Sequence, residues 1–138
     1  MSYNVLVVDD DAGIRGLLEG LLEEEGYNVA TARNGKEALD LLSQRASLGP
    51  HVILLDLMMP VLDGYTFMTM LAADPALRDS HALVIMSAAH RLSEGHFDLA
   101  DALLPKPFAI DDVLEVVGRL THQITRPDIS ADRRPPAS

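Results

Sequence analysis

The feature that most constrains the fold is an aliphatic run that ends on a carboxylate. Residues 52–55 read Val-Ile-Leu-Leu, and Asp56 follows at once. Four consecutive bulky aliphatic residues are typical of a strand buried on both faces, as in a parallel sheet covered by helices. Pro60, Asp63 and Gly64 then supply turn-forming residues. We therefore predict that Asp56 lies at the carboxyl end of a central strand, facing the crevice in which open α/β sheets bind ligands.

Strand-like and helix-like segments alternate along the rest of the chain. Strand patterns occur at 5–8, 27–32, 51–55, 82–86 and 102–105, and helix patterns at 14–22, 35–42, 64–73, 89–99 and 110–120. The clearest helix has an apolar stripe made of Ile14, Leu17, Leu18, Leu21 and Leu22, with Asp11 near its start and Gly26 as its stop. Segment 27–32 has few bulky apolar residues, which predicts an edge strand. Five alternating units predict an α/β fold with a doubly wound, five-stranded parallel sheet.

Length and composition limit the classes of function. The 138 residues, 48% of them hydrophobic, suit a single domain, which we place at residues 1–122, followed by a polar and disordered tail at 123–138. A net charge of -10 argues against binding to nucleic acid or to an anionic membrane. The absence of cysteine excludes disulfides and thiol catalysis. With no leader and no long apolar run, we expect a cytoplasmic protein.

Polar residues end four of the five predicted strands. Asp9 and Asp10 follow the first, Asp56 the third, Ser87 the fourth and Lys106 the fifth. Parallel strands end at one edge of a sheet, so we expect these side chains to converge. Three crowded carboxylates repel one another, so either at least one takes up a proton or a divalent cation neutralises them. Mg²⁺ is the natural candidate for an oxygen-only ligand set. Beside Mg²⁺, Asp56 is able to attack a phosphorus centre while Lys106 and Ser87 hold the phosphoryl oxygens.

These residues resemble a known family, the receiver domain of two-component response regulators. The matching motifs are Val-Val-Asp-Asp at 7–10, Asp-Leu-Met-Met-Pro-Val-Leu-Asp-Gly at 56–64, Ile-Met-Ser-Ala at 85–88 and Lys-Pro-Phe at 106–108. They occur in the family's order, and the resemblance covers residues 3–121. It implies the flavodoxin-like receiver fold, with strand order 2-1-3-4-5 and helices on both faces.

The resemblance also implies a role for each polar position. Asp56 is implied to be the phosphoacceptor, and Asp9 and Asp10 the acid pair that holds Mg²⁺ together with Asp56. The main-chain carbonyl of Met58 is implied to be a further ligand of the metal. Lys106 is the implied partner of the phosphoryl group.

Further parts of the resemblance concern the switch. Ser87 is implied to be the hydroxyl residue that shifts toward the phosphoryl group, and Lys106–Pro107 is expected to be a cis peptide. Receivers usually carry an aromatic switch residue where this chain has Leu103, so aromatic rotation cannot carry the signal here. The segment between Ser87 and Lys106 is also shorter than usual, which predicts a short or irregular fourth helix. The residues after Leu120 are too few for an output domain.

We therefore expect a stand-alone response regulator, a phosphoprotein of a phosphorelay. It accepts a phosphoryl group from a sensor histidine kinase or a phosphotransfer protein, and signals to an unidentified protein target. It is not an enzyme beyond self-catalysed phosphoryl transfer and slow autodephosphorylation. We expect the output face to comprise the fourth helix, fifth strand and fifth helix, made more apolar by Leu103 and Leu104 and covered by a partner or a second copy.

Three alternatives stay open at this point. A magnesium-dependent aspartyl-phosphate phosphohydrolase needs a second acid two residues after the nucleophile, where this chain has Met58. A flavin-binding module needs a phosphate-binding loop after the first strand, but here that loop is acidic. A receiver-like scaffold without phosphorylation is favoured only by the missing aromatic at Leu103.

Overall fold

Five parallel strands form the centre of the molecule. The computed structural model describes residues 3–57, 64–74, 80–88 and 100–124. The strands are β1 (Asn4–Val8), β2 (Asn28–Ala32), β3 (His51–Asp56), β4 (Ala82–Ala88) and β5 (Ala102–Lys106). They make one parallel sheet with the order β2-β1-β3-β4-β5. This confirms the predicted fold class and strand order, with β2 at one edge and β3 in the centre.

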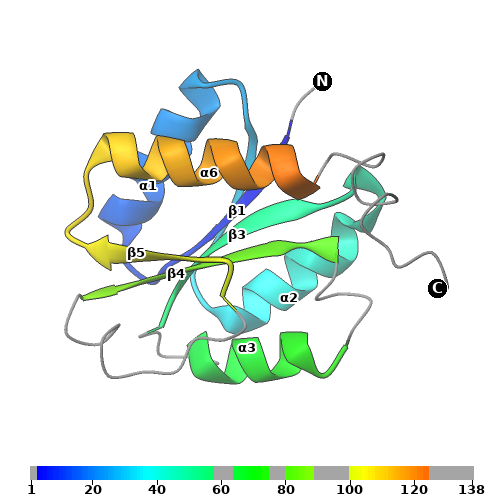
Figure 1. The fold of residues 1–138 in the computed structure, drawn as a ribbon. Coiled ribbons are helices and arrows are strands. Elements are labelled where there is room, and N and C mark those ends of the chain that lie inside the picture. Colours follow the sequence, from blue (N-terminus) through cyan, green and yellow to red (C-terminus); the bar gives the residue numbers. More distant parts are fainter. Residues whose placement is uncertain (1–2, 58–63, 75–79, 89–99, 125–138) are drawn as a thin grey trace, which may run out of the picture.

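Helices cover both faces of this sheet (Figure 1). They are α1 (Ala12–Glu24), α2 (Gly35–Gln44), α3 (Gly64–Ala72) and α6 (Ile110–Ile124), with a short 3₁₀ turn, η1 (Ala46–Leu48). Helices α1 and α6 lie on one face, where Leu18 and Val117 pack in the same cluster. Helices α2 and α3 lie on the other face, where Leu42 and Phe67 share a second cluster. The sheet is thus the middle layer of three.

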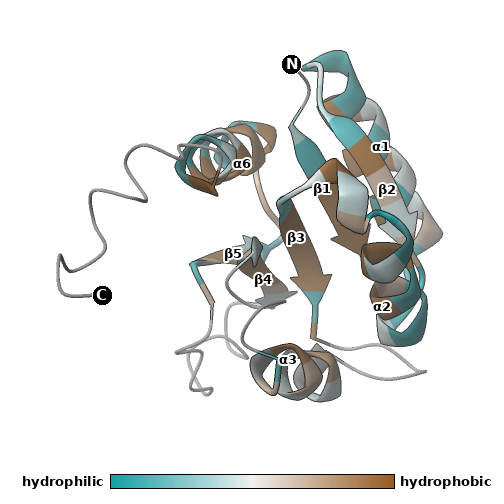
Figure 2. Cartoon of the chain, turned by 90° about the vertical axis from the view of Figure 1, so that its right-hand side faces the viewer, coloured by the Kyte–Doolittle hydropathy of each residue, from teal (hydrophilic) through white to brown (hydrophobic). Residues whose placement is uncertain are grey.

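The central strand is buried on both sides, as its aliphatic run predicts. Val52 and Leu54 belong to the cluster under α1 and α6, whereas Ile53 and Leu55 belong to the cluster under α2 and α3. Alternate residues of a strand point to opposite faces, so one run supplies both cores. The hydropathy colours show the middle of the same strand as apolar (Figure 2).

Local signals place the ends of the helices. Asp11 caps α1 by accepting hydrogen bonds from the backbone N–H groups of Gly13 (2.8 Å) and Ile14 (3.2 Å). Asn34 caps α2 in the same way through the N–H of Glu37 (2.9 Å). Gly26, which follows α1, has a φ of 91°, a backbone conformation that favours glycine. The predicted start and stop of α1 are therefore both confirmed.

Several details differ from the sequence prediction. Leu17 was expected on the buried stripe of α1, but 53% of its surface is exposed. Successive helix residues turn by about 100°, so Leu17 lies beyond the edge of the face centred on Leu18 and Leu22. Strand β4 continues to Ala88, because its last residues pair with β5, and it therefore includes Ser87. Helix α6 continues to Ile124, which packs partly buried against the core.

Two predictions fall on parts of the chain outside the described residues: the fourth helix at 89–99 and most of the polar tail. The Lys106–Pro107 peptide is cis, as expected. In the described part of the chain, none of the helices combines the length and apolar character needed to cross a membrane.

Candidate functional site

The carboxyl ends of the parallel strands bring the predicted polar residues to one edge of the sheet. Asp9 follows the last residue of β1, and Asp56 is the last residue of β3, which pairs with β1. On the other side of β3, Asp56 is in register with Met86, the residue before Ser87. Lys106 is the last residue of β5 and is in register with Ala88 of β4. The topology alone therefore gathers residues that are up to 97 positions apart in the chain.

Asp9 is fully buried, yet each of its polar groups has a partner. Its Oδ2 accepts a hydrogen bond from Lys106 Nζ at 2.7 Å, and its Oδ1 accepts one from the backbone N–H of Asp11 at 2.9 Å. Its own N–H donates to the carbonyl of Ala32, and its carbonyl accepts from Arg15 Nη1 at 2.8 Å. A buried carboxylate is tolerated only when it is paired and hydrogen-bonded in this way.

Lys106 places one positive charge between two carboxylates. Its Nζ lies 2.7 Å from Asp9 Oδ2 and 3.8 Å from Asp56 Oδ2. The lysine side chain is 22% exposed, whereas that of Asp9 is fully buried. An ammonium in this position attracts any anionic group that approaches Asp56.

The three aspartates form a group able to hold a metal ion. One ligand oxygen each from Asp9, Asp10 and Asp56 lies within 4.8 Å of the other two, and Asp10 is the exposed member. One ammonium group does not neutralise three carboxylates, so their mutual repulsion favours a divalent cation. The donors are all carboxylate oxygens, which fits Mg²⁺ and not a softer metal. The residues present therefore fit the metal that the sequence predicts, while the predicted Met58 ligand lies outside the described residues.

Ser87 and Leu103, the two predicted switch residues, lie on adjacent strands. Ser87 is buried within β4 and is in register with Pro105 of β5. Leu103 of β5 is 43% exposed. Leu104 was predicted to share the exposed face with Leu103, but this is wrong, because Leu104 is 2% exposed and belongs to the core under α6. Neighbouring residues of a strand point to opposite faces, so only one of the two leucines can be exposed.

Arg15 is a residue of the site that the sequence prediction missed. It lies in the first turn of α1, and its guanidinium reaches back to the carbonyl of Asp9. The only signal in the sequence is a cation one turn into the helix that follows the acidic residues. That signal is weak, because an exposed arginine on a helix is commonplace.

Comparisons with known proteins agree with this geometry. Residues 5–118 match the family described as the response regulator receiver domain. This chain belongs to that family. The receiver is similar to the response regulator MprA of Mycolicibacterium vanbaalenii, with 37% identity over 131 residues, which are 93% of this chain and 54% of that protein. It is also 37% identical to MprA of Mycobacterium tuberculosis, over 135 residues that are 96% of this chain and 56% of that protein. The receiver thus spans about half the length of these curated relatives.

Solved structures show the same fold. A CheY-like response regulator receiver domain protein from Methanospirillum hungatei superposes with a TM-score of 0.76 and 27% identity, covering 88% of this receiver and 95% of that chain. A putative response regulator from Chloroflexus aurantiacus gives a TM-score of 0.78 and 26% identity, covering 88% of this receiver and 99% of that chain. The chain is accordingly a receiver domain of a two-component response regulator.

Proposed function

We propose that this receiver accepts a phosphoryl group on Asp56, with Mg²⁺ bound, from a phosphohistidine of a sensor histidine kinase or a phosphotransfer protein. The observation that carries the proposal is the single ammonium group of Lys106 between the carboxylates of Asp9 and Asp56, at the edge where three aspartates gather. Phosphoryl transfer depends mainly on positioning and on stabilisation of negative charge. This arrangement supports both requirements.

The side chains of the site supply the steps of the transfer. An Asp56 oxygen forms the new O–P bond as the P–N bond of the donor breaks, and the donor nitrogen keeps the electron pair and takes up a proton from solvent. Lys106 Nζ, 3.8 Å from Asp56 Oδ2, is placed to donate to a phosphoryl oxygen. We assign the same role to the hydroxyl of Ser87. Asp9, Asp10 and Asp56 would hold Mg²⁺, which would supply further positive charge for the phosphoryl oxygens.

Replacement of the acceptor tests the proposal directly. We expect Asp56→Asn to abolish labelling by acetyl phosphate in the presence of Mg²⁺, measured as the mass gain of the intact protein. Hydroxylamine, which cleaves acyl phosphates, removes the label from the wild type. Asp40→Asn is the matched control, because Asp40 is an exposed aspartate of α2 paired with Lys36. Undiminished labelling of Asp56→Asn contradicts the proposal.

We further propose that the receiver is not a multiple-turnover phosphohydrolase. Its chemistry is then limited to its own phosphorylation and to slow loss of that group. The support is the sequence position two residues after Asp56, where a hydrolase of this kind needs an acid and this chain has Met58. Steady release of phosphate from a panel of phosphate esters contradicts this part of the proposal.

The output is proposed to be a change of protein contacts at β5 and the start of α6. Leu103 and Ile110 are both among the exposed large hydrophobic residues there. Sedimentation velocity with and without beryllofluoride, a phosphoryl mimic, tests whether a second copy covers this face. Identical profiles contradict the dimer form of the output. A stand-alone role is a proposal as well, and the mass of the native protein in a cell extract tests it.

A further inference from the structure

Arg15 links helix α1 to the main chain of the acid pair. Its half-buried side chain extends from the first turn of α1, and Nη1 donates a hydrogen bond of 2.8 Å to the carbonyl oxygen of Asp9. Hydrogen bonds with a charged donor are stronger than neutral ones. The acceptor belongs to the peptide unit that joins Asp9 to Asp10. A contact of this kind acts on the backbone between two of the three clustered aspartates.

The Asp9–Asp10 peptide decides where the Asp10 carboxylate lies. The carbonyl of one residue and the Cα atom of the next lie in a single plane, so fixing the Asp9 carbonyl restricts the direction in which Asp10 leaves it. Asp9 is held separately by Lys106 and by the N–H of Asp11. Within the described residues, the Asp10 side chain makes no hydrogen bond or ion pair. The contact from Arg15 holds the peptide before Asp10, and the hydrogen bond from the Asp11 N–H to Asp9 Oδ1 holds the peptide after it.

The charge of Arg15 has the opposite effect on metal binding. A guanidinium that contacts the main chain of the acid pair repels a divalent cation bound there, so its removal strengthens cation binding if charge alone matters. Arg15 also lies close enough to Glu37 to contribute to the lowered pKa of that carboxyl group, after the larger effects of the hydrogen bonds from Arg33. Positioning and charge therefore predict changes of opposite sign when Arg15 is replaced.

We propose that Arg15 is a positioning residue for the metal site. By holding the Asp9–Asp10 peptide, it keeps the carboxylates of Asp9 and Asp10 in the arrangement that binds a divalent cation. The positioning effect outweighs the repulsion between the guanidinium and the cation. This inference rests on the proposed function, because it requires that Mg²⁺ binds the three aspartates.

Titration with MgCl₂, followed by the backbone amide signals of the ¹⁵N-labelled full chain, tests the inference. These signals report the affinity of the folded protein alone, so a loss of stability does not change the measured Kd. We expect Arg15→Met, which keeps the aliphatic stem, to raise the Kd for Mg²⁺ about tenfold, the effect typical of residues that orient metal ligands. Arg15→Lys keeps the charge but is shorter, and we expect it also to bind Mg²⁺ more weakly than the wild type.

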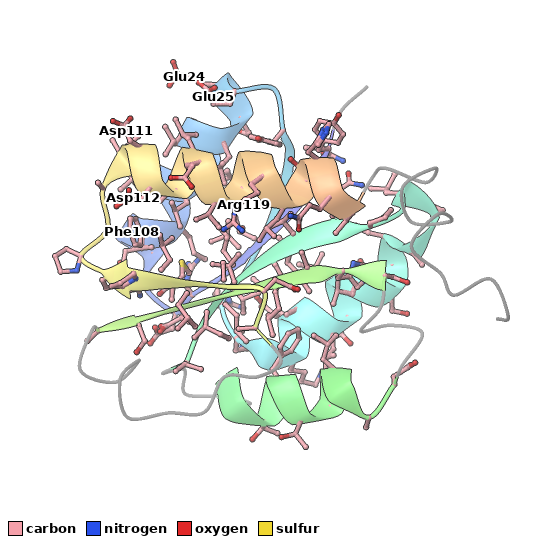
Figure 3. All side chains as sticks on the ribbon, viewed as in Figure 1. Glu24, Glu25, Phe108, Asp111, Asp112 and Arg119 are labelled. Atoms are coloured by element: carbon pink, nitrogen blue, oxygen red, sulfur yellow. The ribbon has the colours of Figure 1, made fainter. Side chains whose placement is uncertain are left out.

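Arg119→Met is the matched control, because it removes one positive charge from the middle of α6 (Figure 3). Arg119 lies nine residues after the start of that helix, roughly 13 Å along its axis. We expect its Kd for Mg²⁺ to stay within about twofold of the wild-type value, because the charge of this exposed side chain is screened by salt.

The outcomes separate this inference from the proposed function. A wild-type protein that binds no Mg²⁺ overturns both. A wild-type protein that binds Mg²⁺ and an Arg15→Met variant that binds it equally or more tightly overturn only the role of Arg15, since that result follows from charge alone. If Arg15→Met does not fold, Arg15→Lys decides, and an unchanged Kd for Mg²⁺ in that variant overturns the inference.

Discussion

Lys106 is the residue that partly neutralises the carboxylates of the site. Asp9 is fully buried, and Lys106 is the cation that contacts its carboxylate, at 2.7 Å. Removing one partner of such a pair leaves an uncompensated charge in a place from which water is excluded. A metal ion at the three aspartates is the alternative source of positive charge. If Mg²⁺ binds as proposed, it and Lys106 would act on the same carboxylates, and each would partly replace the other.

Replacement of Lys106 tests this balance. We expect Lys106→Met to lower the free energy of unfolding by roughly 1–3 kcal/mol in the presence of a chelator, because the Asp9 carboxylate loses its charged donor. Mg²⁺ then restores more stability to this variant than it adds to the wild type. Urea unfolding with and without Mg²⁺ provides the measurement.

The control for this prediction is Lys36→Met. Lys36 lies on the surface of α2, 3.6 Å from Asp40, and exposed pairs of this kind contribute about 0.3–0.5 kcal/mol. Equal urea midpoints for Lys106→Met and the wild type, both with and without Mg²⁺, argue against a shared electrostatic role for Lys106 and the metal.

The acids and the lysine of the site were predictable because each of them ends a strand. Asp9, Asp56 and Lys106 follow aliphatic runs, and parallel strands end at one edge. Arg15 was not predictable in the same way. Its partner is a backbone carbonyl, which every residue carries, so no residue type in the sequence marks the contact. Side-chain chemistry is thus visible in this sequence, while restraints on the main chain are not.

Among the secondary-structure elements, helix α1 connects the acidic loop to the core. Leu18 and Leu22 pack beneath it, and Asp11 caps the end that faces the site. The cap satisfies two backbone N–H groups of the first turn. The same turn holds Arg15, so the stability of the helix start and the placement of Arg15 depend on one another.

We expect Asp11→Ala to lower the free energy of unfolding by about 1 kcal/mol, the usual effect of losing a helix cap. Asp11→Asn is the matched variant, because it removes the same charge and keeps an oxygen that accepts from the first turn. The difference between the two variants isolates the cap from the relief of repulsion near Asp9. Urea unfolding measures it, and equal stabilities for the two variants show that the cap contributes nothing.

Periodicity predicted the existence of the described elements better than their ends. The strand pattern at 82–86 stopped two residues early, because Ser87 and Ala88 are held in β4 by pairing with β5. A local sequence pattern does not show which distant strand a segment pairs with. Leu17 shows the same limit for helices, since the stripe on α1 is wider than the face that the sheet covers.

Across the whole molecule, polar residues lie at both ends of the sheet. The site lies at the carboxyl end, and Asn28, Asn4 and His51 lie in register at the amino end. Asn28 Nδ2 donates to Asn4 Oδ1 at 3.0 Å, and the backbone N–H of His51 donates to His81 Nδ1 at 2.9 Å. The amino end is therefore fixed by hydrogen bonds that include two buried imidazoles.

The surroundings of His51 favour its neutral form. Arg45 Nε lies 3.2 Å from His51 Nε2 and donates to it, so Nε2 carries no proton. His51 Nδ1, 2.9 Å from the carbonyl of Gly49, is then the nitrogen that donates. Burial lowers the pKa of His51, and the charge of Arg45 lowers it further against the opposing effect of the Gly49 carbonyl. Protonation of His51 would replace one hydrogen bond by a contact between two cations.

We expect the stability of the molecule to depend on the protonation of His51. In the unfolded chain this imidazole has its ordinary pKa of 6.5, whereas in the folded protein the pKa is lower. The unfolded state therefore binds more protons as the pH falls below about 6.5, and the free energy of unfolding decreases. The contribution of His51 is fully present above that pH and is lost as the pH falls through the folded pKa. Urea unfolding between about pH 8 and pH 5.5 measures how steeply the free energy of unfolding changes with pH.

Two histidine variants show which residue causes the change of the free energy of unfolding with pH. His51→Gln removes the buried imidazole, so we expect its stability to fall less steeply with acid than that of the wild type, whatever its stability at neutral pH. His122→Gln removes an exposed imidazole from the last turn of α6, and we expect it to keep the wild-type slope. The carboxylates contribute equally in all three proteins, so they cancel in the comparison. A His51→Gln slope equal to that of the wild type shows that His51 is not the group that couples folding at the amino end of the sheet to pH.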